Sequence, residues 1–396
     1  QIFEFNYKKM KIAIIPGVFF PQPGGAQVQT HNLANKLIQM GHEVDVLLLN
    51  KSNVKNNLYN ILIINKFILI FFFYLNFFFK INLSFYLKLY LKKIIDKNKY
   101  DVFHFQLLNF KTLYILELLK DLNQKVVVTF QGIDIQIDKN INYGYRLNES
   151  YEKKFLGVIN KIDKFISISK NIRNDLLSLG IDKNRITMIP NAIEKSKFLQ
   201  FEDAKKNIKE KIFLLTVARF AKEKKGFDLV PPIAKMLKEK KINFQWTIVG
   251  HNSKNMRTIK DMKNFEEYFK YLDNIENLDE KFFPHNDLIK IYIDNHLYIN
   301  LARIESFGIT IIEALASKLP VITFDTKGGN ELIENDYNGI IVKSLSPDQI
   351  VDAIIQYNQN VILYEKHKKN TITSIESFDL YLITKKTIKS YEEMIK

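Results

Sequence analysis

Two glutamates, Glu305 and Glu313, stand eight positions apart and are the residues best suited to act together on a ligand. The stretch between them begins Ser306-Phe307-Gly308 and continues into an apolar pattern that predicts a helix. Eight residues span about 2.2 helical turns, so Glu305 just before the helix and Glu313 inside it can reach along one ligand. Backbone N–H groups at the helix start can bond a sugar or a phosphate. A pair of exposed surface carboxylates is the plain alternative, and the apolar neighbours argue against it.

A run of positive side chains follows the first predicted strand of the second half of the chain. It reads Arg219-Phe-Ala-Lys222-Glu-Lys224-Lys225-Gly226 and leads into a helical pattern. A guanidinium and an ammonium group suit a diphosphate leaving group, because negative charge accumulates on the departing oxygen in the transition state. We therefore expect Arg219 and a lysine of this run to bind a diphosphate. The plain alternative is a solvated lysine run.

A glycine pair, Gly24 and Gly25, lies between the first predicted strand and the first predicted helix. Glycine lets the backbone approach an anion closely, and the helix start offers free N–H groups with a favourable dipole. The segment matches neither the dinucleotide G-x-G-x-x-G pattern nor the phosphate-binding G-x-x-x-x-G-K pattern. The sequence therefore favours a phosphate contact here over a nicotinamide or ATP site, with a plain strand-to-helix turn as the other interpretation.

Short apolar runs alternate with helical patterns along the whole chain, which predicts two α/β domains with parallel sheets. The predicted strands of the first half are Lys11–Ile15, Val44–Leu49, Asp101–Phe105, Lys125–Phe130 and Lys164–Ile168, with helices over Ala26–Met40 and Glu149–Lys161. Those of the second half are Ile212–Ala218, Phe244–Val249, His296–Asn300, Pro320–Phe324 and Gly339–Val342. We expect Rossmann-like domains over residues 10–195 and 211–377, joined by a polar, lysine-rich stretch, and a terminal helix over 378–396.

The composition limits the chemistry and the partners. The chain has 396 residues, no cysteine and a net charge of +15. Thiolate nucleophiles and cysteine metal sites are excluded, and anionic partners such as phosphates or an acidic membrane surface are favoured. No nucleic-acid recognition motif accompanies the basic residues, so nucleic acid is not an expected partner. The beginning of the chain has no leader pattern, so we expect a cytoplasmic protein.

The segment from Ile61 to Phe79 is almost wholly apolar and aromatic, and lysines follow it between positions 80 and 93. A lysine and two asparagines within the segment weigh against a helix that spans a membrane. Two interpretations stay open. The segment is either a buried helix or a face that docks peripherally on the inner, anionic surface of a membrane.

The spacing of the two glutamates, with Ser-Phe-Gly between them, resembles the E-x7-E motif of retaining GT-B glycosyltransferases of family 4, the group 1 glycosyltransferases. The resemblance covers nearly the whole chain. The other matching motifs are Gly24-Gly25, Gly41-His-Glu-Val, Asp101-Val-Phe-His104, Gln131-Gly-Ile-Asp134, Ile168-Ser-Lys, Ile189-Pro-Asn191, Arg219 with Lys225-Gly226, Gly250, Gly328-Gly-Asn-Glu331 and Asn338-Gly339.

The resemblance implies a GT-B architecture, with two Rossmann-like domains that face a central cleft and a C-terminal helix that crosses back to the first domain. It implies transfer of a sugar from a nucleotide-diphosphate sugar, as co-substrate, to a sugar or lipid-linked acceptor in surface polysaccharide or glycolipid synthesis. No other cofactor and no metal are implied. The histidines show no metal-ligand spacing either.

The resemblance also implies roles for individual residues. Glu313 binds the donor ribose, Arg219 and Lys225 bind the diphosphate, and Glu305 contacts the transferred sugar. The remaining substrate-binding positions are Gly24, Gly25, Asn191, Gly250, Ser306, Phe307, Gly308 and Ile309.

Three positions depart from the family pattern. Gln131 stands where many relatives have a histidine, and an amide cannot act as a base but can bond a sugar hydroxyl. Lys318 stands where glycine is frequent, which predicts an altered turn. One extra residue follows Arg219, so either Lys224 or Lys225 is the phosphate partner; we favour Lys225 because it directly precedes the glycine.

Two other functions remain open at this point. A nucleotide-sugar epimerase of the same architecture would change the donor without an acceptor. A non-catalytic sugar-nucleotide-binding or membrane-scaffold protein would bind the nucleotide without turnover, an option that Gln131 and the aromatic segment suggest.

Overall fold

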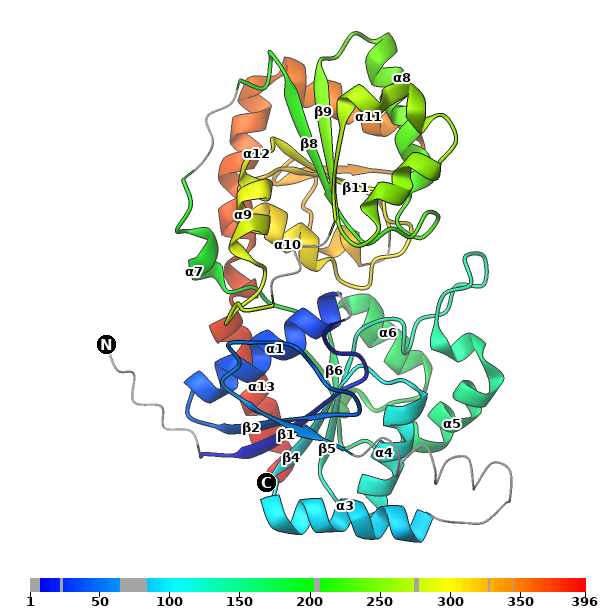
Figure 1. Cartoon of the computed structure of the whole chain (residues 1–396), viewed down its shortest axis with the longest axis vertical. Helices are drawn as coiled ribbons and strands as arrows, with labels where there is room; N and C mark the ends of the chain where they lie inside the picture. The colour runs from blue at the N-terminus through cyan, green and yellow to red at the C-terminus, as the bar shows by residue number, and fades with distance from the viewer. Residues whose placement is uncertain are drawn as a thin grey trace. The chain divides into compact units, whose positions relative to one another are not determined.

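The protein is described from a computed structural model, and the described residues are 8–21, 24–64, 84–202, 207–273, 278–326, 328–343 and 345–396. The chain forms two compact units. The N-terminal unit comprises Gln1–Pro190, Leu278–Phe282 and Ile383–Lys396, and the C-terminal unit comprises Asn191–Asn277 and Phe283–Leu382. Each unit is built around one parallel sheet (Figure 1).

The sheet of the N-terminal unit has seven strands in the order β3-β2-β1-β4-β5-β6-β7. The strands are β1 (Lys11–Pro16), β2 (Glu43–Leu48), β3 (Asn60–Ile63), β4 (Val102–Gln106), β5 (Val126–Phe130), β6 (Lys164–Ser167) and β7 (Ile186–Met188). The helices are α1 (Gly25–Gln39), α3 (Ser84–Asn98), α4 (Phe110–Asp121), α5 (Glu149–Ile159), α6 (Lys170–Ser178) and, from Ile383 on, α13 (Leu380–Ile395). Helices α1 and α13 contact each other, and α4 packs against both α3 and α5 (Figure 1).

The sheet of the C-terminal unit has six strands in the order β10-β9-β8-β11-β12-β13. The strands are β8 (Ile212–Val217), β9 (Phe244–Val249), β10 (Phe269–Leu272), β11 (Leu297–Asn300), β12 (Val321–Phe324) and β13 (Gly339–Val342). The helices are α7 (Lys195–Phe198), α8 (Val230–Glu239), α9 (Asn286–Ile293), α10 (Ile309–Ala316), α11 (Pro347–Gln359) and α12 (Val361–Ser374). Helix α8 packs on α11, and α10 packs on α9 and α12 (Figure 1).

The strand order reverses once in each sheet, between β1 and β4 in the N-terminal unit and between β8 and β11 in the C-terminal unit. Crossover connections leave in opposite directions at such a point, so the loops at the carboxyl ends of the two strands diverge and leave a crevice for a ligand. The loops after β8 and β11 carry Arg219 and Glu305. The topology therefore brings the glutamate motif and the cation motif to the same edge of the second sheet.

A short segment from the middle of the chain, Leu278–Phe282, belongs to the N-terminal unit. His31 Nε2 donates to the carbonyl oxygens of Glu280 (3.0 Å) and Lys281 (3.1 Å), and Asn35 Nδ2 donates to that of Lys281 (2.6 Å). Burial lowers the pKa of His31 to about 4, so the ring is neutral at physiological pH. The neutral His31 ring and Asn35 thus bind the backbone of this segment, and Lys36 of the same helix lies over the ring of Phe282 (4.5 Å to its centroid).

The two-sheet α/β architecture expected from the sequence is confirmed, and all ten predicted strands are present. Three further strands, β3, β7 and β10, were not predicted. Each lies at an edge of its sheet and is short and only partly buried. β7 and β10 lack the continuous apolar run of an interior strand, whereas Ile61–Ile63 of β3 was assigned to the longer apolar segment that starts there.

The apolar segment that begins at Ile61 is not a helix at its start, because Ile61–Ile63 belong to β3. Residues 65–79 lie outside the described residues, so the two interpretations of that segment stay untested. Within the described ranges, the structure has no helix long and apolar enough to cross a bilayer.

The expectation that Lys318 alters the turn after α10 is wrong. Lys318 takes the left-handed conformation (φ 61°) that glycine usually supplies after a helix. Its N–H donates to the carbonyl of Leu315 (3.1 Å), and the N–H of Leu319 donates to that of Ala314 (3.0 Å). These two bonds satisfy the last carbonyls of the helix, so the usual turn is kept at a backbone cost of about 1 kcal/mol.

Candidate functional site

Lys225 and Glu305 form an ion pair at the carboxyl edge of the second sheet. Lys225 Nζ lies 2.7 Å from Glu305 Oε2, and their side chains are only 19% and 16% exposed. Lys225 comes from the loop after β8 and Glu305 from the loop after β11, so the contact crosses the point where the strand order reverses. A carboxylate neutralised in this way no longer repels an anion beside it.

Two glycines let the loops of this edge pack backbone against backbone. Gly226 has φ 67°, and a Cβ atom there would lie 2.0 Å from the carbonyl oxygen of Leu301. Gly328 has φ 89°, and a Cβ atom there would lie 1.9 Å from the carbonyl oxygen of Glu305. No other residue fits either position without displacing the neighbouring strand exit. The loops after β8, β11 and β12 are therefore in direct contact around Lys225 and Glu305.

Arg303 fastens the loop after β11 to the loop after β8. Its guanidinium donates two bonds to the carboxylate of Asp228 (2.7 and 2.6 Å) and one to the carbonyl of Glu223 (2.6 Å). Its backbone N–H donates to the carbonyl of Lys224 (3.0 Å). Asp228 raises the pKa of Arg303, which keeps the charge in place. The fork-shaped contact fixes the chain on either side of Lys225.

The same loop concentrates positive charge. Burial, then the neighbouring Lys225 and Arg219, lower the pKa of Lys224 to about 7, and Glu305 opposes this shift. The Arg219 side chain is exposed. Arg219 and Lys225, with Lys224 partly protonated near neutral pH, give this loop a surplus of positive charge, so an anion such as a diphosphate would be stabilised here.

Glu313 is buried within α10, where its side chain is 5% exposed. Its Oε2 accepts a hydrogen bond from the hydroxyl of Tyr292 in α9 (2.9 Å), and among the described residues Oε1 has no donor. Burial raises the pKa of Glu313 to about 7, and the bond from Tyr292 acts in the opposite direction. One carboxylate oxygen is thus held by the protein and the other can accept a ligand hydroxyl.

Helix α10 begins where the sequence predicted it, directly after Ser306-Phe307-Gly308. Gly308 is the N-cap residue and Ile309 the first helical residue. Tyr298 supports the first turn through a bond from its hydroxyl to Thr310 Oγ1 (2.7 Å). Ser306 and Phe307 are buried. The N-terminus of α10 therefore follows closely in sequence on Glu305, the carboxylate that pairs with Lys225.

Phe307 connects the loop to the beginning of the C-terminal unit. Its ring packs edge-on against Phe378, with centroids 5.8 Å apart. The carbonyl of Phe378 accepts from the N–H of Ile193 (3.0 Å), two residues after the buried Asn191. Gly250, directly after β9, packs against a different part of the edge. A Cβ atom there would lie 2.3 Å from the carbonyl oxygen of Ala218 and 3.1 Å from the backbone nitrogen of Arg219.

The other predicted site residues belong to the N-terminal unit. Gly24 is the N-cap residue of α1 and Gly25 its first residue, as expected for a strand-to-helix corner. Gln131 follows β5 directly, and its Nε2 donates to Oε1 of Gln106 at the end of β4 (3.1 Å). Asp134 closes the turn by accepting from the N–H groups of Gln131 (3.1 Å) and Gly132 (2.9 Å).

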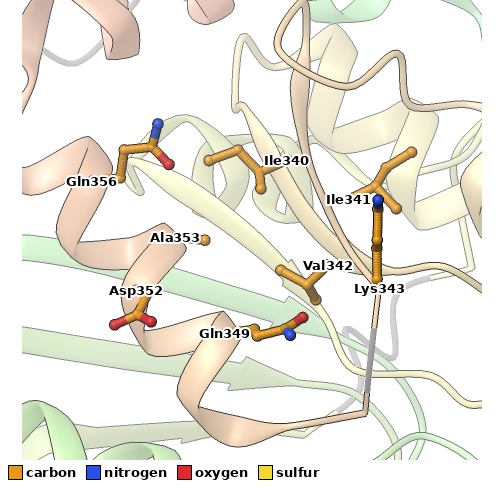
Figure 2. A pocket seen from close by; sticks show the side chains of 8 residues that line it. All are labelled: Ile340, Ile341, Val342, Lys343, Gln349, Asp352, Ala353 and Gln356. Atoms are coloured by element: carbon orange, nitrogen blue, oxygen red, sulfur yellow. The ribbon is translucent and has the colours of Figure 1, made fainter.

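A surface pocket of about 280 Å³ lies elsewhere, between β13 and α11 (Figure 2). Its lining residues are Ile340, Ile341, Val342, Lys343, Gln349, Asp352, Ala353 and Gln356. None of the predicted site residues lines it. The loops around Lys225 and Glu305 are the better candidate, because charge and hydrogen-bonding groups converge there.

Sequence reasoning missed three residues of the site. Arg303, Tyr292 and Tyr298 make contacts with residues distant in sequence, which no local pattern reveals. Lys224 was weighed only as an alternative to Lys225, whereas the structure brings both to the same carboxylate. In the described part of the chain, no cluster of three or more histidine or acidic side chains could hold a metal ion.

Replacing Arg303 with alanine is predicted to cost about 1.5–3 kcal/mol of unfolding free energy, because two charge-assisted bonds are lost and Asp228 is left unpaired. Urea unfolding measures this cost. The matched control is Arg257→Ala, whose ion pair with Glu266 is more exposed (54% and 38%) and is worth about 0–1 kcal/mol. Equal costs for the two variants would contradict the role given to Arg303.

Glu313→Gln is predicted to change how stability depends on pH. A folded-state pKa of about 7 against 4.5 means that the folded protein binds more protons than the unfolded chain in this window. Stability of the parent protein therefore falls as pH rises from about 4.5 to about 7, by on the order of 3 kcal/mol from this group, and the glutamine removes that component. Urea titrations across the window test it, with the exposed Glu239→Gln as control. A parallel pH dependence in parent and Glu313→Gln would refute the assignment.

Two sequence families match the chain in succession. The model of Glycosyltransferase Family 4 matches residues 23–197, and that of Glycosyl transferases group 1 matches residues 199–374. Together they include Arg219, Lys224, Lys225, Arg303, Glu305 and Glu313.

Three known proteins are similar over almost the whole length. An uncharacterized glycosyltransferase of Methanocaldococcus jannaschii is 25% identical over 389 residues, covering 97% of this chain and 99% of its own. A glycosyltransferase from Rickettsia africae superposes with a TM-score of 0.75 at 19% identity, covering 98% of this chain and 100% of its own. HepE from Anabaena, solved with UDP and glucose, gives a TM-score of 0.72 at 13% identity, covering 97% and 99%.

The charged edge of the second sheet, the order of its motifs and these similarities agree. The chain belongs to the family 4 (group 1) glycosyltransferases and has the GT-B fold.

Proposed function

We propose that the protein transfers a sugar from a UDP-sugar to a sugar or lipid-linked acceptor, with retention of configuration at the anomeric carbon. The observation that carries this proposal is the Lys225–Glu305 ion pair with Arg219 nearby, at the edge where the strand order reverses. The choice of UDP is supported by the UDP complex of HepE, which has the same fold. The proposed setting is surface polysaccharide or glycolipid synthesis.

Each group of the site has a role in this proposal. Arg219 and Lys225 bind the diphosphate, and Lys224 adds a third cation. Glu305 contacts a hydroxyl of the transferred sugar. The free oxygen of Glu313 accepts from a ribose hydroxyl, because the Tyr292 hydroxyl holds the other oxygen at 2.9 Å.

The chemical step needs no carboxylate nucleophile. The bond between the anomeric carbon and the diphosphate oxygen breaks while the acceptor oxygen bonds to the same carbon from the same face. The acceptor proton passes to the departing diphosphate oxygen. Arg219 and Lys225 stabilise the charge on that oxygen as the bond breaks. Because the ion pair with Lys225 fixes the position of the Glu305 carboxylate, Glu305 can hold the sugar in place during this step.

Activity with a panel of nucleotide sugars tests the proposal. Glu305→Gln and Lys225→Met are predicted to lose transfer by about 10²–10³-fold, because each removes an interaction with developing charge or with the sugar. Lys222→Met, an exposed lysine of the same loop, is the control and is expected to keep activity. Proton NMR of the product reads the anomeric configuration.

Two results would overturn the proposal in different ways. Conversion of the donor to an epimer without an acceptor would identify an epimerase. Nucleotide binding without transfer or donor hydrolysis, across the panel, would identify a non-catalytic binding protein. Full activity in both Glu305→Gln and Lys225→Met would refute the site assignment.

We propose in addition that the outward face of α3, in the N-terminal unit, makes a peripheral contact with an anionic membrane. Tyr86 and Leu89 are 57% and 48% exposed there, and Lys92, Lys93 and Lys97 are exposed on the same helix. An exposed apolar side chain flanked by lysines matches the interface of an acidic bilayer. We place this contact at the inner, cytoplasmic face of the membrane.

Vesicle flotation tests the contact. The triple variant Lys92→Gln, Lys93→Gln and Lys97→Gln is predicted to weaken binding to phosphatidylglycerol-containing vesicles about 100-fold, since each lysine near such a surface contributes about 1 kcal/mol. The control removes the same charge from α8 and the residue that caps its C-terminus, in Lys235→Gln, Lys238→Gln and Lys240→Gln. If the parent protein does not float at low salt, or if both triple variants behave alike, the contact is excluded.

A further inference from the structure

Thr310 is the second residue of α10, lies between Glu305 and Glu313 in sequence, and is half-buried. Its Oγ1 accepts a hydrogen bond of 2.7 Å from the hydroxyl of Tyr298 in β11. The same tyrosine hydroxyl donates, at the longer distance of 3.2 Å, to the backbone carbonyl of Val217, the last residue of β8. The hydroxyl of Thr310 therefore lies where the exit of β8 meets the first turn of α10.

Tyr298 is the donor in its bond to Thr310. Its side chain is only 1% exposed, and burial raises the pKa of its hydroxyl, so the hydroxyl keeps its proton. The charges of Glu305 and Glu313 shift this pKa in the same direction, so both carboxylates lie near the hydroxyl. Because Tyr298 donates, Thr310 keeps its own hydroxyl proton for another acceptor.

The hydroxyl proton of Thr310 lacks the partner that a threonine in a helix usually has, a carbonyl of its own helix. Five other helical threonines donate to a carbonyl oxygen three or four residues earlier, at 2.8–3.0 Å: Thr30, Thr112, Thr371, Thr373 and Thr387. Over the described ranges of the chain, the hydroxyl proton of Thr310 has no acceptor of this or any other kind. It is therefore available to a ligand.

The charges near this hydroxyl suit an anionic ligand. Arg219 follows Val217 by two residues, and Lys225 lies in the same loop, so both cations come from the strand exit to which Tyr298 is bonded. The first turn of a helix also favours negative charge. Phosphate oxygens accept hydrogen bonds, and a hydroxyl adds a donor to the cations without adding charge. A donor at this place complements Arg219 and Lys225 in binding a diphosphate.

We infer that the hydroxyl of Thr310 donates a hydrogen bond to a phosphate oxygen of the donor diphosphate, and that Tyr298 is a positioning residue that orients this hydroxyl. Since Thr310 Oγ1 accepts from Tyr298, its own proton is directed away from that bond. A valine at position 310 has nearly the same shape but leaves the phosphate oxygen without this donor. The inference rests on the proposed binding of a nucleotide-diphosphate sugar at the Lys225–Glu305 edge.

Binding of UDP and of uridine to variants of the full chain tests the contact, because only UDP carries the diphosphate. Thr310→Val is predicted to weaken UDP binding about 10- to 100-fold, the value of a hydrogen bond to a charged group, and to leave uridine binding unchanged. Thr310→Ser keeps the hydroxyl and is expected to restore UDP binding. Tyr298→Phe is expected to weaken UDP binding in the parent but not in the Thr310→Val background, since Tyr298 acts through the threonine hydroxyl.

Thr373→Val in α12 is the matched control. The hydroxyl of Thr373 also pairs with a tyrosine hydroxyl, that of Tyr337 (3.0 Å), and donates to the carbonyl of Asn370 (2.9 Å). It is exposed and lies outside the site, so this variant should bind UDP as the parent does. Thermal unfolding checks that each variant is folded, and Thr310→Ala takes the place of Thr310→Val if the valine variant does not fold.

Equal UDP affinities of Thr310→Val and Thr373→Val would overturn the inference. An equal loss of UDP and uridine binding in Thr310→Val would overturn it as well, because such a loss marks a structural role. The role of Tyr298 fails if Tyr298→Phe weakens UDP binding equally in both backgrounds. If the parent binds UDP but transfers no sugar, the proposed reaction fails, while these affinities still decide the contact. If the parent binds no UDP, the inference and the choice of UDP as donor nucleotide both fail.

Discussion

The close packing of backbone against backbone at the carboxyl edge of the second sheet is the constraint on which the site depends. Gly226 and Gly328 bring three strand exits so near to each other that a single methyl group does not fit. Because the loops meet at this distance, Lys225 reaches Glu305, and Arg303 reaches both Asp228 and the carbonyl of Glu223. Rigidity of the main chain thus substitutes for long side-chain networks in positioning the charges.

This packing brings like charges close together beside Glu305, which pairs with Lys225 (2.7 Å). Burial, and after it the neighbouring charges of Lys225 and Arg219, lower the pKa of Lys224. A diphosphate would supply the missing negative charge, so binding and charge neutralisation are the same event. In the N-terminal unit, the amide of Gln131 after β5 makes a neutral contact instead, the bond from its Nε2 to Gln106 Oε1 (3.1 Å).

The sequence predicted the interior of both sheets well and their edges poorly. Interior strands are buried on both faces and show continuous apolar runs, whereas β7 and β10 are short, half-exposed and without such a run. The apolar residues of β3 were hidden within the longer apolar segment that begins at Ile61. The turn at Lys318 could not be predicted either, because local bonds to the carbonyls of Leu315 and Ala314 accompany a left-handed conformation that a lysine's own preference opposes. The glutamate and cation motifs were found because each is local. Arg303, which bonds Asp228, and Tyr292, which bonds Glu313, were not found. These contacts join residues that only the fold brings close together.

The central claim is that the Lys225–Glu305 edge is where the donor diphosphate binds, and a crystal structure of the protein with UDP tests it most directly. We expect diphosphate oxygens within about 3 Å of both the Arg219 guanidinium and the Lys225 ammonium group, and a ribose hydroxyl within hydrogen-bond distance of Glu313. A UDP molecule bound elsewhere, for example between β13 and α11, with Arg219 and Lys225 free of phosphate, would contradict the account.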